Sequence, residues 1–133
     1  MRETLTEGLK MARNRMVKPE YWEDEKIASV QRESRLTFIA LWNLSDDYGV
    51  VKGNSIWLKN RIFPYDEDLS LSDFETWIAE LVKISVIYPF NNNGEKYYFI
   101  KNFLKHQRID KPTPSKRNPV PPIDISDNSD SFR

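Results

Sequence analysis

The chain has 133 residues, 39% of them hydrophobic and 13% aromatic, with no cysteine and a single histidine, His106. A chain of this length buries roughly two-thirds of its unfolded surface, which predicts one domain with a modest core. The absence of cysteine excludes disulfides and thiolate chemistry, and one histidine excludes a histidine-rich metal site. Apolar runs are short, so we expect neither a membrane span nor a secretory signal, and we predict a cytoplasmic protein.

The charges are unevenly distributed, although 20 basic and 20 acidic residues sum to zero. The net charge is +3 over residues 1–18, −6 over 19–100, +5 over 101–118 and −2 over 119–133. Such blocks are often solvated faces with no specific partner. The alternative is that the two basic segments meet in space and form a phosphate-binding surface.

The N-terminal part begins with an arm and an extended segment. Residues 1–12 have no strong period and are expected to form a flexible arm. Residues 15–18 precede Pro19 and are predicted to be extended, because proline disfavours helical conformation in the residue before it. The acidic residues 23–25 then suit the first turn of a short helix that ends near Val30.

Two helices and a short strand are predicted next. Residues 34–45 are so densely apolar that most of the circumference of this helix is expected to be covered. Gly49 can adopt the left-handed conformation that ends it, before a short strand at residues 50–51. Asn54 or Ser55 can cap a second helix that Pro64 stops, with Ile56, Leu58, Ile62 and Phe63 on its apolar face.

The remaining elements are a helix, a hairpin and a tail. Ser72 stands three residues before Glu75, the spacing of a capping box, and predicts an amphipathic helix over residues 72–84. Two β-prone runs flank Asn93-Gly94, a strong hairpin signal. Asn102 is expected to cap a short basic helix. From about residue 110 the proline-rich chain is predicted to be a tail that forms no packed core.

This order of elements predicts an α+β winged helix-turn-helix, in which the hairpin is the wing and the preceding helix is the recognition element. We therefore divide the chain into a flexible arm (1–12), a winged-helix domain (13–109) and a flexible tail rich in proline, serine and aspartate (110–133). A small α+β domain of another topology would share the same order of elements.

Several segments of the chain form a recognisable pattern, namely residues 15–22 (RMVKPEYW), 35–49 (RLTFIALWNLSDDYG), 63–64 and 97–107, with Pro112 and Ser115 downstream. Together they resemble the N-terminal winged-helix domain of bacteriophage replication-initiation proteins. Members of this family are also called replisome organisers and are related in fold to DnaD-like primosomal proteins. The resemblance implies a module that binds DNA or assembles the replisome of a phage or prophage in the bacterial host cell. The family usually adds a second domain that recruits helicase machinery. This chain stops at residue 133, so we expect a stand-alone or truncated module.

The candidate DNA contacts are mainly basic residues after the hairpin. If about five of them touched phosphates, the logarithm of affinity would fall with log salt with a slope of roughly 4 to 5. The alternative is a solvated tail that Phe103 and Leu104 anchor to the core. The candidates are Lys101, Lys105, His106, Arg108, Lys111, Lys116 and Arg117, with Arg13, Arg15 and Lys18 from the start of the domain, Lys59 and Arg61 from the second helix, and Lys96 near the wing tip.

The predicted recognition helix is acidic, with a net charge of −2 over its polar positions, and it lacks arginine and asparagine, the usual base readers. Either it does not enter the major groove, or it binds a protein. The alternative function is therefore protein interaction or self-association through helix 72–84. A transcriptional regulator would share the same fold.

No catalytic motif is present in the sequence. There is no nucleophile elbow, phosphate loop or dinucleotide fingerprint, so we expect no enzyme activity, no cofactor and no small-molecule substrate. Asp46 and Asp47 are explained by a turn at a helix end. Trp57 is expected at an edge of the core, where a partner could cover it.

Overall fold

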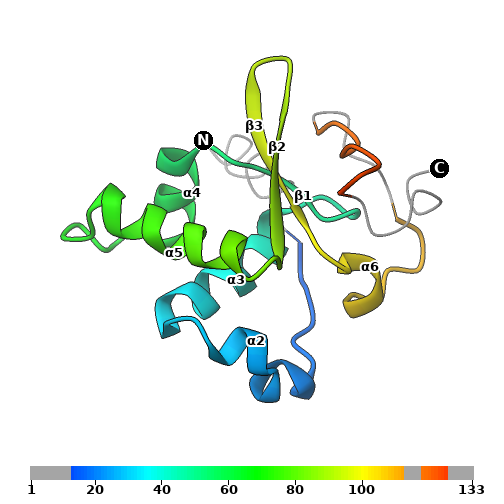
Figure 1. The fold of residues 1–133 in the computed structure, drawn as a ribbon, viewed down its shortest axis with the longest axis horizontal. Coiled ribbons are helices and arrows are strands. Elements are labelled where there is room, and N and C mark those ends of the chain that lie inside the picture. Colours follow the sequence, from blue (N-terminus) through cyan, green and yellow to red (C-terminus); the bar gives the residue numbers. More distant parts are fainter. Residues whose placement is uncertain (1–12, 113–117, 126–133) are drawn as a thin grey trace, which may run out of the picture.

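The computed structural model describes residues 13–112 and 118–125, which form a mixed α+β domain with a three-stranded antiparallel sheet. Within the described ranges, no helix is long and apolar enough to cross a membrane. The β2–β3 hairpin extends away from the helices, and α6 lies at the other end of the sheet (Figure 1). The elements are η1 (Pro19–Glu23), α2 (Glu25–Ala28), α3 (Arg32–Leu44), β1 (Val50–Lys52), α4 (Ser55–Ile62), α5 (Leu71–Lys83), β2 (Ile87–Asn92), β3 (Glu95–Ile100) and α6 (Phe103–His106).

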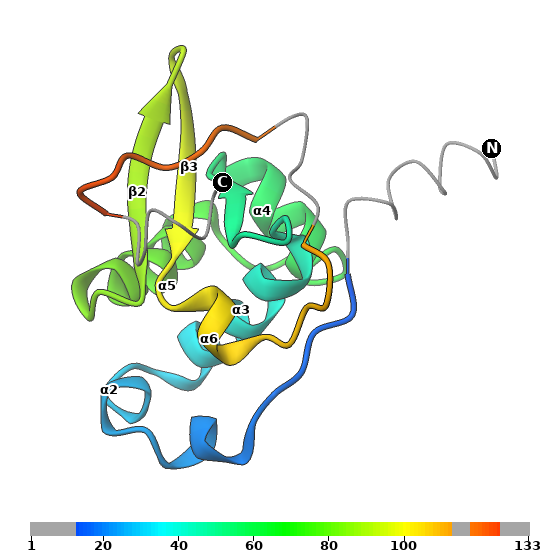
Figure 2. The same ribbon diagram turned by 90° about the vertical axis from the view of Figure 1, so that its right-hand side faces the viewer.

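The sheet has the strand order β1-β3-β2, and both pairings are antiparallel. The hairpin predicted from Asn93-Gly94 is confirmed, because these two residues form the loop with φ of 51° and 80°. A two-residue loop with both φ values positive matches the twist of the flanking strands. Figure 2 shows β2 and β3 rising together beyond the rest of the domain.

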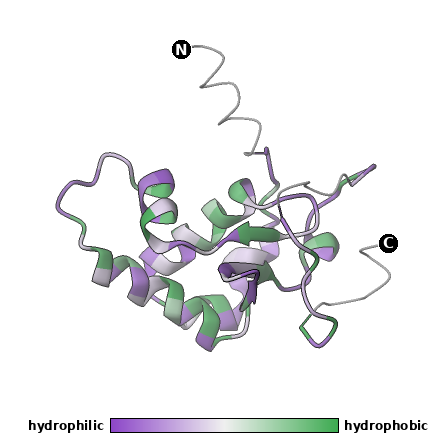
Figure 3. Cartoon of the chain, turned by 90° about the horizontal axis from the view of Figure 1, so that it is seen from above, coloured by the Kyte–Doolittle hydropathy of each residue, from purple (hydrophilic) through white to green (hydrophobic). Residues whose placement is uncertain are grey.

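The main core lies between one face of the sheet and helices α3, α4 and α5. Because side chains alternate along a strand, Tyr98 and Ile100 point to this face while Tyr97 and Phe99 point to the other. Phe74 and Leu81 of α5 are fully buried in the same core. Hydrophobic and hydrophilic residues alternate along the helices in Figure 3, as expected for helices buried on one side.

Helix α3 spans nearly the predicted range, and most of its circumference is covered. Leu41 and Thr37 are fully buried, whereas Leu36 on the opposite side is 55% exposed. From residue 34 to the end of the helix all the remaining side chains are buried or half-buried, so the expectation that most of the circumference is covered is confirmed except at Leu36. Helix α5 packs on α3, and the Tyr21 ring lies against Phe38 and Trp42.

The N-cap of α4 is the predicted residue, whereas the N-cap of α5 is not. Asn54 caps α4 as predicted, since its Oδ1 accepts from the N–H of Trp57 at 2.9 Å. Ile56 was assigned to the apolar face of this helix but is exposed. Helix α5 starts earlier than predicted, because the hydroxyl of Ser70, and not that of Ser72, accepts from the N–H of Asp73 at 3.0 Å.

Asn102 does not cap α6 through its side chain, so this prediction is also wrong. It has a left-handed backbone with φ of 57°, and its carbonyl accepts from the N–H groups of Lys105 and His106. The expected anchoring of this segment is confirmed, because Phe103 is buried in the core and Leu104 packs against it.

Residues 118–125 contact the outer face of the sheet, where Phe90, Tyr97 and Phe99 form a second apolar cluster. Ile125 packs against this cluster, Pro121 is buried, and Asn118 Nδ2 donates to the carbonyl of Val50 at 3.0 Å. The segment crosses the hairpin in Figure 2. The expectation that nothing after residue 110 packs is therefore wrong here, because the outer face is apolar and needs cover. The arm 1–12 and residues 126–133 lie outside the described residues.

Candidate nucleic-acid interface

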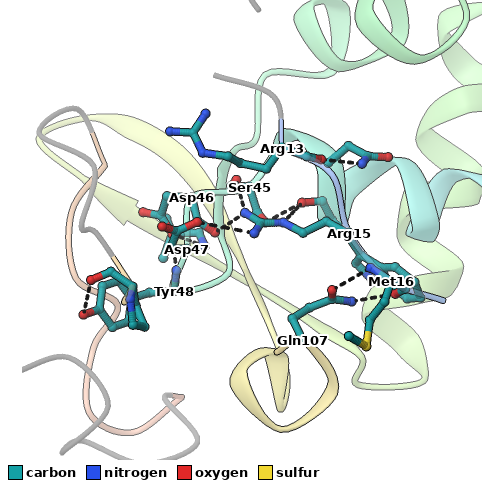
Figure 4. A network of polar contacts seen from close by, with 12 residues as sticks. Arg13, Arg15, Met16, Ser45, Asp46, Asp47, Tyr48 and Gln107 are labelled. Carbon is teal, nitrogen blue, oxygen red and sulfur yellow. Dashed lines mark hydrogen bonds and ion pairs between the residues drawn. The ribbon is translucent and has the colours of Figure 1, made fainter. Parts of the chain in front are cut away.

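The two basic segments at the ends of the domain meet in space. The side-chain amide of Gln107 accepts from the N–H of Met16 and donates to its carbonyl, both at 2.9 Å. The ammonium of Lys18 donates to the carbonyl of Lys105 at 3.1 Å. Figure 4 shows Gln107 lying against the Met16 backbone. Residues 15–18 therefore lie beside residues 103–107, although they are distant in sequence.

Arg15 holds residues 13–18 against the rest of the domain. Its guanidinium donates to the carbonyls of Trp42 at 3.0 Å and of Ser45 and Asp46 at 3.1 Å, and it pairs with the Asp47 carboxylate at 3.3 Å (Figure 4). These carbonyls lie in the last turn of α3 and just after it, where helical carbonyl groups have no partner within the helix. The Arg15 side chain is 5% exposed. Arg15 was a candidate phosphate contact, and these contacts instead give it a structural role.

The environment of Arg15 also acts on its pKa. Burial lowers the pKa of the guanidinium below its ordinary value, and the neighbouring Asp47 opposes this by favouring the charged form. The ring of Phe103 lies 5.0 Å below the guanidinium carbon. Arg13 contacts α3 through its backbone. Its N–H donates to the carbonyl of Asn43, and its carbonyl accepts from the side-chain amide of Asn43. The Arg13 side chain remains exposed.

The joined segments surround one pocket of about 440 Å³. Its edge, which we call the basic rim, consists of Lys18, Lys26, Lys101, Lys105 and His106. Four of these residues were candidates from the sequence. Lys26 was missed because it follows the acidic residues 23–25 along the chain, and only the fold turns it toward the others. Arg108 and Lys111 follow the rim on exposed positions.

The other candidate cations lie elsewhere. Lys96 and Lys101 are at opposite ends of β3, about 17 Å apart at the usual rise of a strand. Lys96 lies over the ring of Tyr98, and Arg61 of α4 lies over the ring of Trp57. Lys59 is on the same helix. The structure therefore does not join these three cations to the basic rim. Lys116 and Arg117 lie outside the described residues.

Helix α5 has fewer available acidic groups than its sequence suggests. The carboxylate of Glu80 accepts from the N–H and side-chain amide of Gln31 at 3.0 and 2.6 Å, and from the hydroxyl of Ser34 at 2.8 Å. Burial favours a higher pKa for Glu80, but these hydrogen bonds and Lys83 outweigh it and hold the pKa below its ordinary value. Glu80 thus caps the start of α3, a role that sequence reasoning missed.

Asp46 organises the turn after α3, as its position in the sequence indicated. Its Oδ1 accepts from the N–H groups of Tyr48 and Val50 at 2.9 and 3.0 Å. Burial raises the pKa of Asp46, and these hydrogen bonds oppose the shift. Gly49 has φ of 86°, and a Cβ there would lie 2.7 Å from the Cβ of Phe103. Among the residues that the structure describes, no group of three or more acidic or histidine side chains could hold a metal ion.

Comparisons of the chain with protein-family models, with curated proteins and with solved structures gave no match.

Proposed function

We propose that this chain is a winged-helix DNA-binding module of phage or prophage DNA replication that contacts mainly the phosphate backbone and performs no catalysis. The order α3, β1, α4, α5, β2, β3 and the strand order β1-β3-β2 support the winged-helix assignment. In this assignment α5 is the recognition helix and the β2–β3 hairpin is the wing.

The observation that carries the DNA-binding proposal is the junction of the two basic segments. Lys18, Lys101 and Lys105 line one surface, and Arg108 and Lys111 are exposed a few residues further along the chain, in a domain whose body has a net charge of −6 over residues 19–100. Cations brought together in this way attract phosphates and release their counterions. Helix α5 offers no arginine or asparagine for reading bases. We therefore place the main DNA contacts on the basic surface and not on α5.

Fluorescence anisotropy with labelled duplex and single-stranded DNA tests this proposal. The double variant Lys105→Ala with Arg108→Ala removes two exposed cations of the proposed surface. We expect it to weaken binding and to reduce the salt slope by about 2. A matched control is Arg32→Ala with Lys83→Ala, which removes the same charge from exposed positions on α3 and α5.

The control pair separates a specific surface from a general effect of net charge. We expect it to bind DNA nearly as well as the wild type. Equal losses in both double variants would contradict the assignment of the surface. No binding of the wild type at low salt would contradict the proposed function itself.

A second candidate function, protein interaction or self-association, is favoured by the loop between α4 and α5. Tyr65 is 93% exposed there, and Asp66, Glu67 and Asp68 beside it are exposed as well. The loop is mainly hydrophilic in Figure 3. Together with Asp73 and Glu75 it forms an acidic end that would suit a basic partner. Sedimentation at several concentrations tests self-association; a monomer at every concentration would contradict it.

A further inference from the structure

The pocket inside the basic rim has a feature that binding to a phosphate backbone does not use. Below the rim its lining is mainly apolar and comes from residues 16–21, α2, α3, the end of β3 with the segment before β2, and α6, with Ser85, Asn102 and Gln107 among the polar members. The apolar and aromatic lining residues are Met16, Tyr21, Ile27, Phe38, Trp42, Val86, Ile100 and Phe103. Phosphates contact cations and N–H groups, so this apolar floor indicates a ligand with a nonpolar group.

The charges around the pocket favour an anionic ligand. Lys18, Lys26, Lys105 and His106 line it, and so does Lys101, whose ammonium lies 5.8 Å from the centre of the Tyr88 ring. Two carboxylates oppose them, those of Glu20 and Asp24. One of these is already used, because Asp24 Oδ1 accepts from the N–H of Ile27 at 3.1 Å. The rim is therefore cationic overall, although the domain body is acidic.

The floor is better suited to an inserted side chain than to a stacked base. Phe38 and Trp42 are each 7% exposed and Phe103 is 2% exposed, so they present only small parts of their rings. A base that stacks on a protein needs an accessible aromatic face. A volume of about 440 Å³ is in the range of small ligand pockets and can hold one large side chain with its backbone.

We propose that this pocket binds an acidic peptide segment of a partner protein that carries one large apolar side chain. The apolar side chain enters the floor, and the flanking carboxylates pair with the rim lysines. Charge complementarity with the rim and the apolar floor below it favour this partner. Because Lys101 and Lys105 also belong to the proposed DNA surface, such a peptide would compete with DNA for them.

A labelled synthetic peptide of aspartate and glutamate with one central phenylalanine is the probe, and binding is measured by anisotropy without DNA. The matched peptide has alanine in place of phenylalanine. We expect the phenylalanine peptide to bind at least about tenfold more tightly, since a buried aromatic side chain contributes that much or more. Equal affinities would overturn the proposal, because the floor would then have no role.

Met16 and Val17 offer a matched pair of variants. They are adjacent, 40% and 38% exposed, and only Met16 lines the pocket. Met16→Ser removes an apolar group and keeps the bonds to Gln107, which involve the Met16 backbone. We expect Met16→Ser to weaken peptide binding several-fold and Val17→Ser to leave it unchanged. Equal effects of the two changes would overturn the proposal.

The variant Lys26→Ala distinguishes the peptide proposal from the proposed DNA-binding function. Lys26 lies on the rim but on α2, which is not one of the two basic segments of the proposed DNA surface. We expect Lys26→Ala to weaken peptide binding more than DNA binding, and Lys83→Ala on α5 to change neither. Peptide binding without DNA binding would refute the proposed function alone. Binding of DNA with no binding of the phenylalanine peptide would refute the peptide proposal alone.

Discussion

Replacement of Gln107 by alanine perturbs the contact on which the basic surface depends. The Gln107 amide makes two hydrogen bonds of 2.9 Å with the Met16 backbone and is itself buried. Each such bond contributes about 0.5 to 1.5 kcal/mol, so we expect a loss of about 2 kcal/mol in the free energy of unfolding. Water can reach the released Met16 groups because this residue is exposed, which limits the penalty to that range.

Urea unfolding measures this loss, and hydrogen exchange of the Met16 amide shows whether the arm is released. We expect faster exchange in Gln107→Ala and weaker DNA binding, since Lys18 no longer stays beside Lys105. Gln31→Ala is a matched control, because its amide makes one exposed bond, to Glu80, and its loss should cost less. Unchanged stability together with a protected Met16 amide would refute the reasoning.

Three further changes test the structural roles assigned above. Gly49→Ala should lower the free energy of unfolding by about 2 kcal/mol or more, because Gly49 has a positive φ and a Cβ there would clash with Phe103. Gly94→Ala should lower it by about 1 kcal/mol, because Gly94 also has a positive φ but open space around its Cβ position. Urea unfolding midpoints of the two variants test this difference. Arg15→Lys should cost about 3 kcal/mol in the same assay, because lysine cannot reach all four acceptors; a loss below about 1 kcal/mol would refute the capping role. The carboxyl of Glu80 has a lowered pKa in the folded state, so it stabilises the fold above pH 4.5, which is the ordinary pKa of a glutamate, and this contribution is lost as the pH falls through the lower pKa. The free energy of unfolding of Glu80→Gln should therefore fall less steeply toward acid pH than that of the wild type. Identical pH dependence in the two proteins would contradict this.

The elements predicted from the sequence are those with strong local signals. The amphipathic period of α5 and the Asn93-Gly94 turn involve neighbouring residues only, so the pattern contains what determines them. Exact starts were harder to predict, because Ser70 and Ser72 are chemically equal as caps. The exposure of Leu36 could not be predicted, because it depends on which side of α3 packs against other elements, and the tertiary structure decides this.

The candidate site was predictable in composition and not in geometry. The basic segments were visible as charge blocks, but their junction depends on Gln107, a single amide with no distinguishing pattern around it. Arg15 resembled its neighbour Arg13 in sequence, and only the position of the α3 carbonyls separates a buried cap from an exposed cation. Such contacts join residues about thirty or ninety positions apart, beyond the reach of local pattern.

The salt dependence of DNA binding by the wild-type chain tests the central claim most directly. If about five cations of the joined basic segments contact phosphates, the plot of log affinity against log salt for duplex DNA has a slope of roughly −4 to −5. Between about 50 and 200 mM salt the affinity then falls by several hundredfold. A slope near zero, or no binding at about 50 mM salt, would contradict the account.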